Sequence, residues 1–371
     1  MTDDSYPRDI PGLTSLRFFA AVWVVIHHYV AWLVPEGGAE VHVPVINMGS
    51  LAVDFFFVLS GFILTHAHRE QLKTRSLPYI DFLVRRIARI YPMHLLTLLF
   101  YLAMVVALAA AHVPLPNPER YSALQFLLNV FLVHAWQFHD AGAWNYPSWS
   151  VSAEWAAYLV FPIFAVPVMA LSTRVSSMAM VLASLALLLM LFWLVPQALG
   201  KSFFELHSNF GYVRIFPEFL LGIALYRLGA GRPMPLLGHP AVIGLTVLAT
   251  IAMAWQRWEL PVVLALAFLI LAVAESARSG RTGLLTSRSA IYGGEISYDL
   301  YMVHLPVATV MLKGSAMLLH TQSAPLWMLP LATLVALAAA AFCHRYLETP
   351  ARMAILRTWR NRRLRQAATV V

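Results

Sequence analysis

The sequence predicts an all-α integral membrane protein with about ten transmembrane helices, and three observations lead to that fold class. Hydrophobic residues make up 60% of the 371 positions and charged residues only 12%, whereas a soluble domain carries about 25% charged residues. Apolar runs of bilayer length recur along the chain, and the basic residues gather in short segments between them. We therefore expect a single membrane-embedded domain over residues 1–371, with no room for a large soluble domain.

The predicted spans follow the apolar runs, because a helix of about 20 apolar residues crosses the hydrocarbon core of a bilayer. The first run contains Arg17, and no small-residue cleavage site follows it, so we expect a retained helix rather than a signal peptide. Residues 124–136 are apolar but too few to span, which predicts a re-entrant or interfacial segment. The ten runs lie at 13–34, 50–68, 91–112, 150–170, 177–196, 213–228, 239–254, 259–275, 292–312 and 325–347.

The distribution of Lys and Arg predicts the orientation, because loops rich in these residues stay on the cytoplasmic side. The C-terminal tail from about residue 352 and the segment 69–89 are rich in arginine, whereas residues 35–45 contain no Lys or Arg. Ten spans then place both termini in the cytoplasm, and we expect a multi-pass integral membrane protein. The net charge of +8 does not predict nucleic-acid binding, because the basic residues form no single patch.

Two ionisable side chains in the first run predict a functional site inside the membrane. Such groups are costly at membrane depth and by default indicate function. Arg17 and His28 are eleven residues apart, which returns a helix to nearly the same face about 16 Å further along its axis. Arg17 has forked donors that suit a phosphate, and the imidazole of His28 suits general-base catalysis. Helix packing is the alternative for His28, and we expect it for the neighbouring His27.

The next two segments add a carboxylate and an arginine cluster. Asp54 stands at the outer end of the second run, where it is predicted either to orient a histidine or to cap its helix. Arg85, Arg86 and Arg89 enter the third span from the cytoplasm. Arg85 and Arg89 are one helical turn apart, so this pair is predicted to grip a phosphate of a polyanionic donor. The alternative is simple anchoring of the span at the membrane surface.

Two later runs carry polar stripes on one helical face. Ser150 and Glu154 are one turn apart in a helix that begins near Trp149, and Tyr301 and His304 share a face of a later run. A polar stripe on a membrane helix has to face protein or a water-filled cavity. We therefore expect these side chains at a substrate site, although Trp149 could instead belong to the aromatic belt at the membrane interface.

Taken in order, these segments resemble the acyltransferase 3 family of membrane proteins. The family's opening pattern of arginine, ten residues and histidine is matched by Arg17 and His28. The sequence departs from the family at Ala153, where many members have a second acidic residue, and it has no room for the extracytoplasmic domain that many members carry. Its other motifs are matched at 54–62, at Arg85, Arg86, Arg89 and Pro92, at Trp149, Ser150 and Glu154, at Ser297, Tyr298, Tyr301 and His304, and at Glu348 and Pro350.

The resemblance implies an O-acyltransferase that moves an acyl group, commonly acetyl, from cytoplasmic acetyl-CoA to a hydroxyl group, with no metal. The acceptor stays open among lipopolysaccharide O-antigen, exopolysaccharide, peptidoglycan, a glycolipid and a macrolide-type small molecule. A proton-coupled transporter is the alternative, because buried ionisable residues also form proton relays. A transporter is expected to contain two related halves, and the sequence contains no such repeat.

The resemblance also implies a role for each candidate residue. His28 would take the proton of the acceptor or carry the acyl group itself, and Asp54 or Glu154 would fix the tautomer of His28. Four arginines would bind the phosphates of CoA, and four further residues would contact the substrates. The residues expected to bind CoA are Arg17, Arg85, Arg86 and Arg89. The residues expected to contact the substrates are Trp149, Ser150, Tyr301 and His304.

Overall fold

The computed structural model describes residues 6–33, 43–115, 118–137, 144–281 and 283–368, and within them the chain is helical and forms no strand. The predicted all-α class is therefore confirmed. In this part of the chain, seven helical stretches are long and apolar enough to cross a bilayer, while the predicted number of ten spans and their sidedness stay predictions. The seven are Pro11–Leu33, Pro44–Ala67, Tyr79–Ala110, Tyr146–Met169, Arg174–Leu199, Glu259–Arg278 and Met328–Gln366.

Each of the ten predicted runs overlaps a helix, and two helices are continued by π-helical turns at Thr309–Lys313 and His344–Glu348. The α-helices are α1 (Pro11–Leu33), α2 (Pro44–Asn47), α3 (Ala52–Ala67), α4 (Arg69–Lys73), α5 (Tyr79–Ala110), α6 (Ala123–Val130), α7 (Trp149–Met169), α8 (Arg174–Leu199), α9 (Gly211–Gly231), α10 (Pro240–Trp255), α11 (Glu259–Arg278), α12 (Arg288–Glu295), α13 (Ser297–Ala308), α14 (Gly314–Leu318), α15 (Met328–Cys343) and α16 (Thr349–Ala368).

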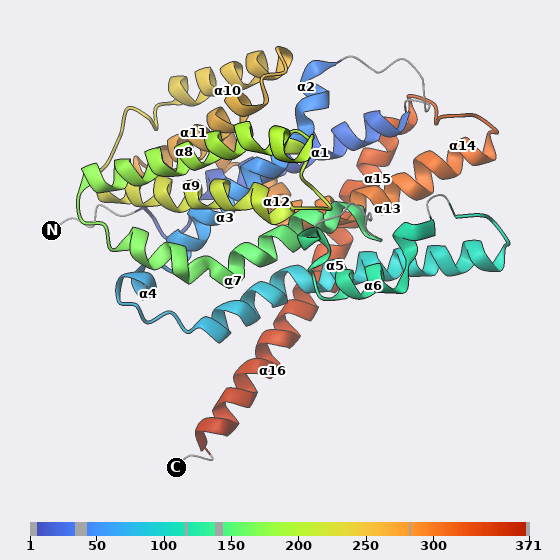
Figure 1. The fold of residues 1–371 in the computed structure, drawn as a ribbon, viewed down its shortest axis with the longest axis horizontal. Coiled ribbons are helices and arrows are strands. Elements are labelled where there is room, and N and C mark those ends of the chain that lie inside the picture. The colour runs from blue at the N-terminus through green and yellow to red at the C-terminus, as the bar shows by residue number, and fades with distance from the viewer. Residues whose placement is uncertain (1–5, 34–42, 116–117, 138–143, 282, 369–371) are drawn as a thin grey trace.

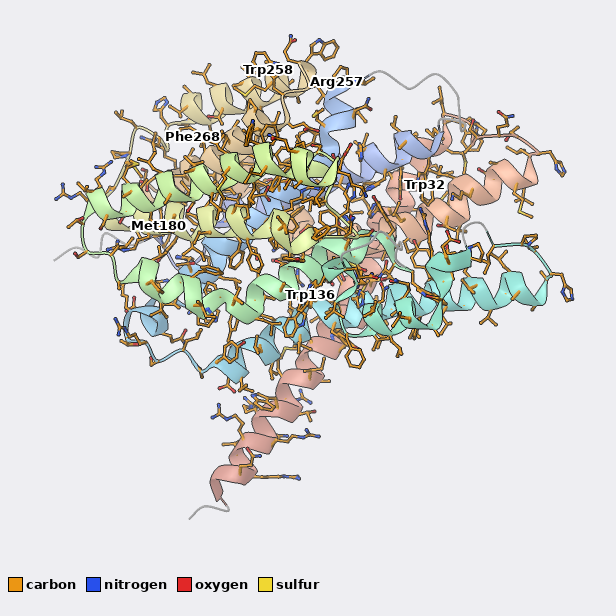
Figure 2. All side chains as sticks on the ribbon, viewed as in Figure 1. Trp32, Trp136, Met180, Arg257, Trp258 and Phe268 are labelled. Atoms are coloured by element: carbon orange, nitrogen blue, oxygen red, sulfur yellow. The ribbon has the colours of Figure 1, made fainter. Side chains whose placement is uncertain are left out.

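The long helices form a bundle, and α16 projects away from it (Figure 1). Within the bundle α3 and α8 pack on α9, α1 packs on α12 and α13, and α13 packs on α15. Figure 2 shows Trp32 of α1 and Met180 of α8 toward opposite ends of the bundle.

The outer surface of the bundle is apolar, as a protein in a bilayer requires. Trp193 of α8 is 64% exposed, Leu245 of α10 is 66% exposed and Leu334 of α15 is 64% exposed. Helices α3 and α9 are instead largely buried in the centre. Exposed apolar patches of this extent are unfavourable in water, so these outer faces suit contact with lipid.

Two glycines allow the central helices α3 and α9 to touch along their backbones. A Cβ atom on Gly61 would lie 2.1 Å from the carbonyl oxygen of Phe219, and one on Gly222 would lie 2.0 Å from that of Val58. Small residues commonly permit such close helix contacts inside membranes. The contact sets the position of α3, which carries the polar residues Asp54 and Ser60.

The segment 124–136 does not form a helical span. Its helix, α6, contains eight residues, which corresponds to a rise of about 12 Å, whereas the hydrocarbon core is about 30 Å thick. This agrees with the predicted re-entrant or interfacial segment.

Candidate active site

A cavity of about 220 Å³ lies among α1, α3, α5, α7 and α13. Residues that lie far apart in the sequence meet in its wall, so the structure brings motifs from four of the predicted runs together. Apolar side chains such as Phe56, Phe57 and Ile63 form much of the remaining wall. The predicted site residues that line the cavity are Arg17, Arg86, Arg89, Ser150, Glu154 and Tyr301.

Three arginines make one part of the cavity wall strongly basic. Arg89 donates to Oε1 of Glu348 at 2.9 Å, but within the described residues neither Arg17 nor Arg86 forms an ion pair. The guanidinium group of Arg86 lies beside the ring of Tyr158, at 5.9 Å, and its Nε atom is buried without a hydrogen-bond partner. Unpaired guanidinium groups are costly in a low-dielectric interior, so this part of the cavity suits a polyanion.

Arg85 does not belong to this basic cluster, although the sequence predicted its pairing with Arg89. The side chain of Arg85 is exposed and does not line the cavity. Helix α5 turns Arg86, Arg89 and Ile90 toward the cavity, so its rotation against the neighbouring helices selects Arg86 over Arg85. The arginines that share the cavity wall are therefore Arg17, Arg86 and Arg89.

Glu154 is held within the cavity wall by a neighbouring helix. Its Oε1 atom accepts a hydrogen bond of 2.6 Å from the hydroxyl group of Ser60 on α3. Ser60 and Tyr158, one turn beyond Glu154, line the same cavity. Within the described part of the chain Glu154 does not contact His28, so the predicted orientation of the histidine by Glu154 is not what the structure shows.

Ser150 and Tyr301 join two helices at the edge of the cavity. Their hydroxyl oxygens are 2.7 Å apart, and the Tyr301 hydroxyl is also 2.8 Å from the carbonyl oxygen of Pro147. Both residues line the cavity. The backbone carbonyl oxygen of Tyr301 lies 2.6 Å from Nδ1 of His304, so Tyr301 connects the cavity wall to His304, which does not itself line the cavity.

His28 and His304 contact each other directly, and their hydrogen bonds indicate one tautomer for each ring. Nδ1 of His304 faces the Tyr301 carbonyl oxygen and must therefore carry a proton, which leaves Nε2 as an acceptor. Nδ1 of His28 lies 3.1 Å from that Nε2 and 3.1 Å from the carbonyl oxygen of Val24. The network thus assigns the proton of His28 to Nδ1. Nε2 of His28 keeps its lone pair, as a general base or nucleophile requires.

The other histidine of the first run packs between helices, as the sequence predicted. Nδ1 of His27 lies 3.2 Å from the carbonyl oxygen of Ile46 on α2. The backbone of His304 is held in turn by the Tyr29 hydroxyl group, which donates to its carbonyl oxygen at 2.9 Å. Residues next to His28 therefore serve the packing, while His28 itself faces His304.

Asp54 orients an arginine rather than a histidine. Both of its carboxylate oxygens accept from Arg214 of α9, at 2.8 and 2.7 Å, and both side chains are fully buried. The two predicted roles of Asp54, histidine orientation and helix capping, are therefore both replaced by a bidentate ion pair. Such a pair requires α3 and α9 to lie close together, and the close contact of the two helices at Gly61 allows this.

Arg214 and Glu218 are the residues that the sequence analysis missed. The guanidinium group of Arg214 lies 5.2 Å from the ring of Trp149, so the predicted substrate residue Trp149 packs on this ion pair. Glu218 is also fully buried and lies beside the Asp54–Arg214 ion pair, where its carboxyl group faces that of Asp54. The sequence did contain a signal for both residues, because Arg214 and Glu218 are ionisable residues inside the apolar run 213–228.

Comparisons with known proteins identify the family of this chain. The family model for the acyltransferase domain, acyltransferase 3, matches residues 10–345. The acyltransferase MdmB of Streptomyces mycarofaciens is 35% identical over 161 residues, which is 42% of this chain and 39% of that protein. The putative peptidoglycan O-acetyltransferase YrhL of Bacillus subtilis is 29% identical over 48% of this chain and 27% of its own length.

A third relative, the O-acetyltransferase OatA of Staphylococcus aureus, is 27% identical over 42% of this chain and 25% of its own length. The matched segments thus span less than half of each of these curated relatives. No solved structure matches the chain. The family model nevertheless covers nearly the whole chain and includes the arginines, the histidine pair and the cavity, and the chain therefore belongs to the acyltransferase 3 family.

Proposed function

We propose that this protein is a membrane O-acyltransferase that moves an acyl group, with acetyl expected, from cytoplasmic acyl-CoA to a hydroxyl group of a cell-envelope glycan or another acceptor. The observation that supports this most directly is the placement of two sites next to each other. Arg17 and Arg86, which form no ion pair among the described residues, line the same cavity as Ser150 and Tyr301, and Tyr301 contacts His304, which contacts His28.

The basic part of the cavity suits the donor. CoA carries several phosphate groups, and guanidinium groups bind phosphate with two parallel hydrogen bonds. Arg17, Arg86 and Arg89 would supply those donors, and the apolar wall around Phe56 and Phe57 suits the pantetheine arm. Arg17 and His28 are separated by about 16 Å along α1, which is the distance that the bound donor would bridge.

The histidine pair suits the transfer step. Nε2 of His28 takes the proton of the acceptor hydroxyl group, and the oxygen bonds to the thioester carbonyl carbon. The carbon–sulfur bond breaks, and the proton passes from His28 to the sulfur, which leaves as the free thiol of CoA. The products are the acyl ester and CoA. His304 supports the step because its Nε2 accepts a hydrogen bond from Nδ1–H of His28 and so stabilises the imidazolium that forms.

Direct attack by the acceptor and transfer through an acyl group on Nε2 of His28 use the same atoms in a different order. YrhL is named a putative peptidoglycan O-acetyltransferase and OatA an O-acetyltransferase. These names favour acetyl as the acyl group and a glycan hydroxyl as the acceptor for this chain. The apolar outer surface agrees with a location in the bacterial inner membrane.

The proposal is tested with the full chain in vesicles. Radiolabelled acetyl-CoA is supplied on the side of the arginines, and cell-envelope glycans are supplied on the other side. Transfer of label to a glycan is expected for the native chain and for His27→Ala, and loss of transfer is expected for His28→Ala at equal membrane insertion. An active His28→Ala variant would remove the assignment of His28, and movement of a solute without acylation would favour a transporter instead.

A further inference from the structure

The arginine cluster is supported from behind by a buried group of ionisable side chains centred on Glu348. Glu348 lies in the π-helical turn between α15 and α16 and is fully buried. Its Oε1 atom accepts from Arg89 at 2.9 Å and from Arg352 at 3.3 Å. One side of the Glu348 carboxylate is therefore used to hold an arginine of the cavity wall.

The opposite side of Glu348 faces a histidine and a second buried carboxylate. Oε2 of Glu348 lies 3.3 Å from Nδ1 of His344, and Oδ2 of Asp299 on α13 lies 3.0 Å from the same nitrogen. Nδ1 of His344 must carry a proton, because it faces acceptors only. Asp299 and Glu348 thus share one N–H donor, and neither carboxylate side chain is exposed to solvent.

The charges of this cluster favour a hydrogen-bonded network over a metal site. The three side chains Asp299, His344 and Glu348 could hold a cation by their proximity. However, Glu348 already contacts Arg89 and Arg352. The negative charges of Asp299 and Glu348 are therefore balanced by the positive charges of these two guanidinium groups. A divalent cation would add uncompensated charge in a low-dielectric environment next to further arginines, which is unfavourable.

The network leads directly to the cavity. Tyr298 precedes Asp299 on α13 and lines the cavity, and the guanidinium group of Arg89 lies 5.3 Å from its ring. Arg89 is thus held from two sides, by the ring of Tyr298 and by Oε1 of Glu348. Oε2 of Glu348 also accepts from the Thr349 hydroxyl group at 3.2 Å. Without the His344 donor, this weaker contact alone would hold Oε2, and the carboxylate that accepts from Arg89 would be less firmly oriented.

We propose that Asp299 and His344 are positioning residues of the donor site, which hold Glu348 so that Arg89 points into the cavity toward a polyphosphate ligand. The ligand class rests on the proposed function, whereas the positioning of Arg89 does not. Asp299 and His344 act through Glu348 and would not touch the donor.

The first test measures the position of Arg89 without any ligand. Purified full-length protein is treated with phenylglyoxal, and the modification of each arginine is followed by mass spectrometry. His344→Leu and Asp299→Leu are expected to increase the modification rate of Arg89 severalfold. His344→Asn should stay close to the native rate, because the side-chain amide nitrogen of asparagine can replace Nδ1 as the donor. The exposed Arg345 serves as the internal reference.

The second test measures CoA affinity by calorimetry on the same variants. His344→Leu should weaken CoA binding about tenfold, as expected when one charge-assisted contact is lost, and it should add little to Arg89→Ala. His320→Leu is the control, because His320 is exposed in the turn after α14. An unchanged rate at Arg89, failure of His344→Asn to rescue, or equal losses in the native and Arg89→Ala backgrounds would overturn the positioning role.

The two measurements separate the two proposals. If the native protein binds no CoA while Arg89 becomes reactive in His344→Leu, the donor proposal fails and the positioning of Arg89 stands. If the native protein instead binds Zn²⁺ or Mn²⁺ and His344→Asn and His344→Leu both lose that metal, the cluster is a metal site and the positioning proposal is wrong.

Discussion

Nε2 of His304 lies 3.1 Å from Nδ1 of His28, although the two residues are 276 positions apart in the sequence. The contact matters because Nδ1 of His304 is already committed to the carbonyl oxygen of Tyr301. Nε2 of His304 can therefore only accept a hydrogen bond from Nδ1–H of His28, which leaves the lone pair of His28 on its Nε2. The sequence analysis placed His304 among the substrate contacts, whereas the structure places it behind the proposed base.

The first prediction concerns His304. His304→Leu removes the acceptor for Nδ1 of His28, and we expect kcat for acetyl transfer to fall about 10²-fold, within the range of general-base contributions. His304→Gln should retain most of the activity, because its amide oxygen can lie near the position of Nε2 and accept the same proton. Steady-state kinetics with acetyl-CoA measure both variants, and KM for the donor should change little. Equal activities of the Leu and Gln variants would contradict this role.

The second prediction separates two adjacent arginines. Arg86→Ala removes a guanidinium group that lines the cavity and has no ion pair within the described residues, so we expect the Kd of CoA to rise about tenfold or more. Arg85→Ala is the matched control, because its exposed side chain does not line the cavity. Calorimetry on the purified variants measures both affinities. Equal weakening by the two substitutions would argue for a general surface charge effect.

Salt provides a further check on the same pair. Exposed charges are screened by added salt, whereas buried charges are screened much less. Any effect of Arg85→Ala should therefore disappear between low and high ionic strength, while the effect of Arg86→Ala should persist. If the two effects fall together as salt rises, Arg86 does not contact the bound anion within the cavity.

Features of this site that depend on local sequence could be predicted, whereas contacts between distant residues could not. Helices and the candidate residues Arg17, Glu154 and Arg89 were predictable, because apolar runs and ionisable residues at membrane depth are both visible in a sequence. The partners of these side chains were not predictable from the sequence. Asp54, for example, contacts Arg214, which lies 160 positions away in the chain. Which of Arg85 and Arg86 faces inward depends on the rotation of α5 against its neighbours, and no local pattern sets that rotation.

The third prediction concerns the buried ion pair of Asp54 and Arg214. Asp54→Ala leaves a fully buried guanidinium group without its carboxylate, and we expect a destabilisation of about 3–5 kcal/mol. The double variant Asp54→Leu with Arg214→Leu should be closer to the native stability, because it removes both charges together. Thermal unfolding in detergent measures all three proteins. A double variant less stable than Asp54→Ala would contradict the argument.

The last prediction concerns the crossing of α3 and α9. Gly61→Ala places a Cβ atom 2.1 Å from the carbonyl oxygen of Phe219, so the two helices must separate. Overpacking of this kind costs about 1–3 kcal/mol, and the melting temperature should fall. Gly244→Ala on α10 is the matched control, because a Cβ atom there meets nothing within 4 Å. Alanine also favours a helix over glycine, so the control should be neutral or slightly stabilising.

The same substitution should also disturb the site. Ser60 precedes Gly61 on α3 and donates to Glu154 in the cavity wall, so a shift of α3 lengthens that 2.6 Å hydrogen bond. We therefore expect Gly61→Ala to weaken acetyl transfer even below its melting temperature, whereas Gly244→Ala should not. Normal activity in a destabilised Gly61→Ala protein would show that the α3–α9 contact serves stability alone and that the position of Ser60 does not depend on it.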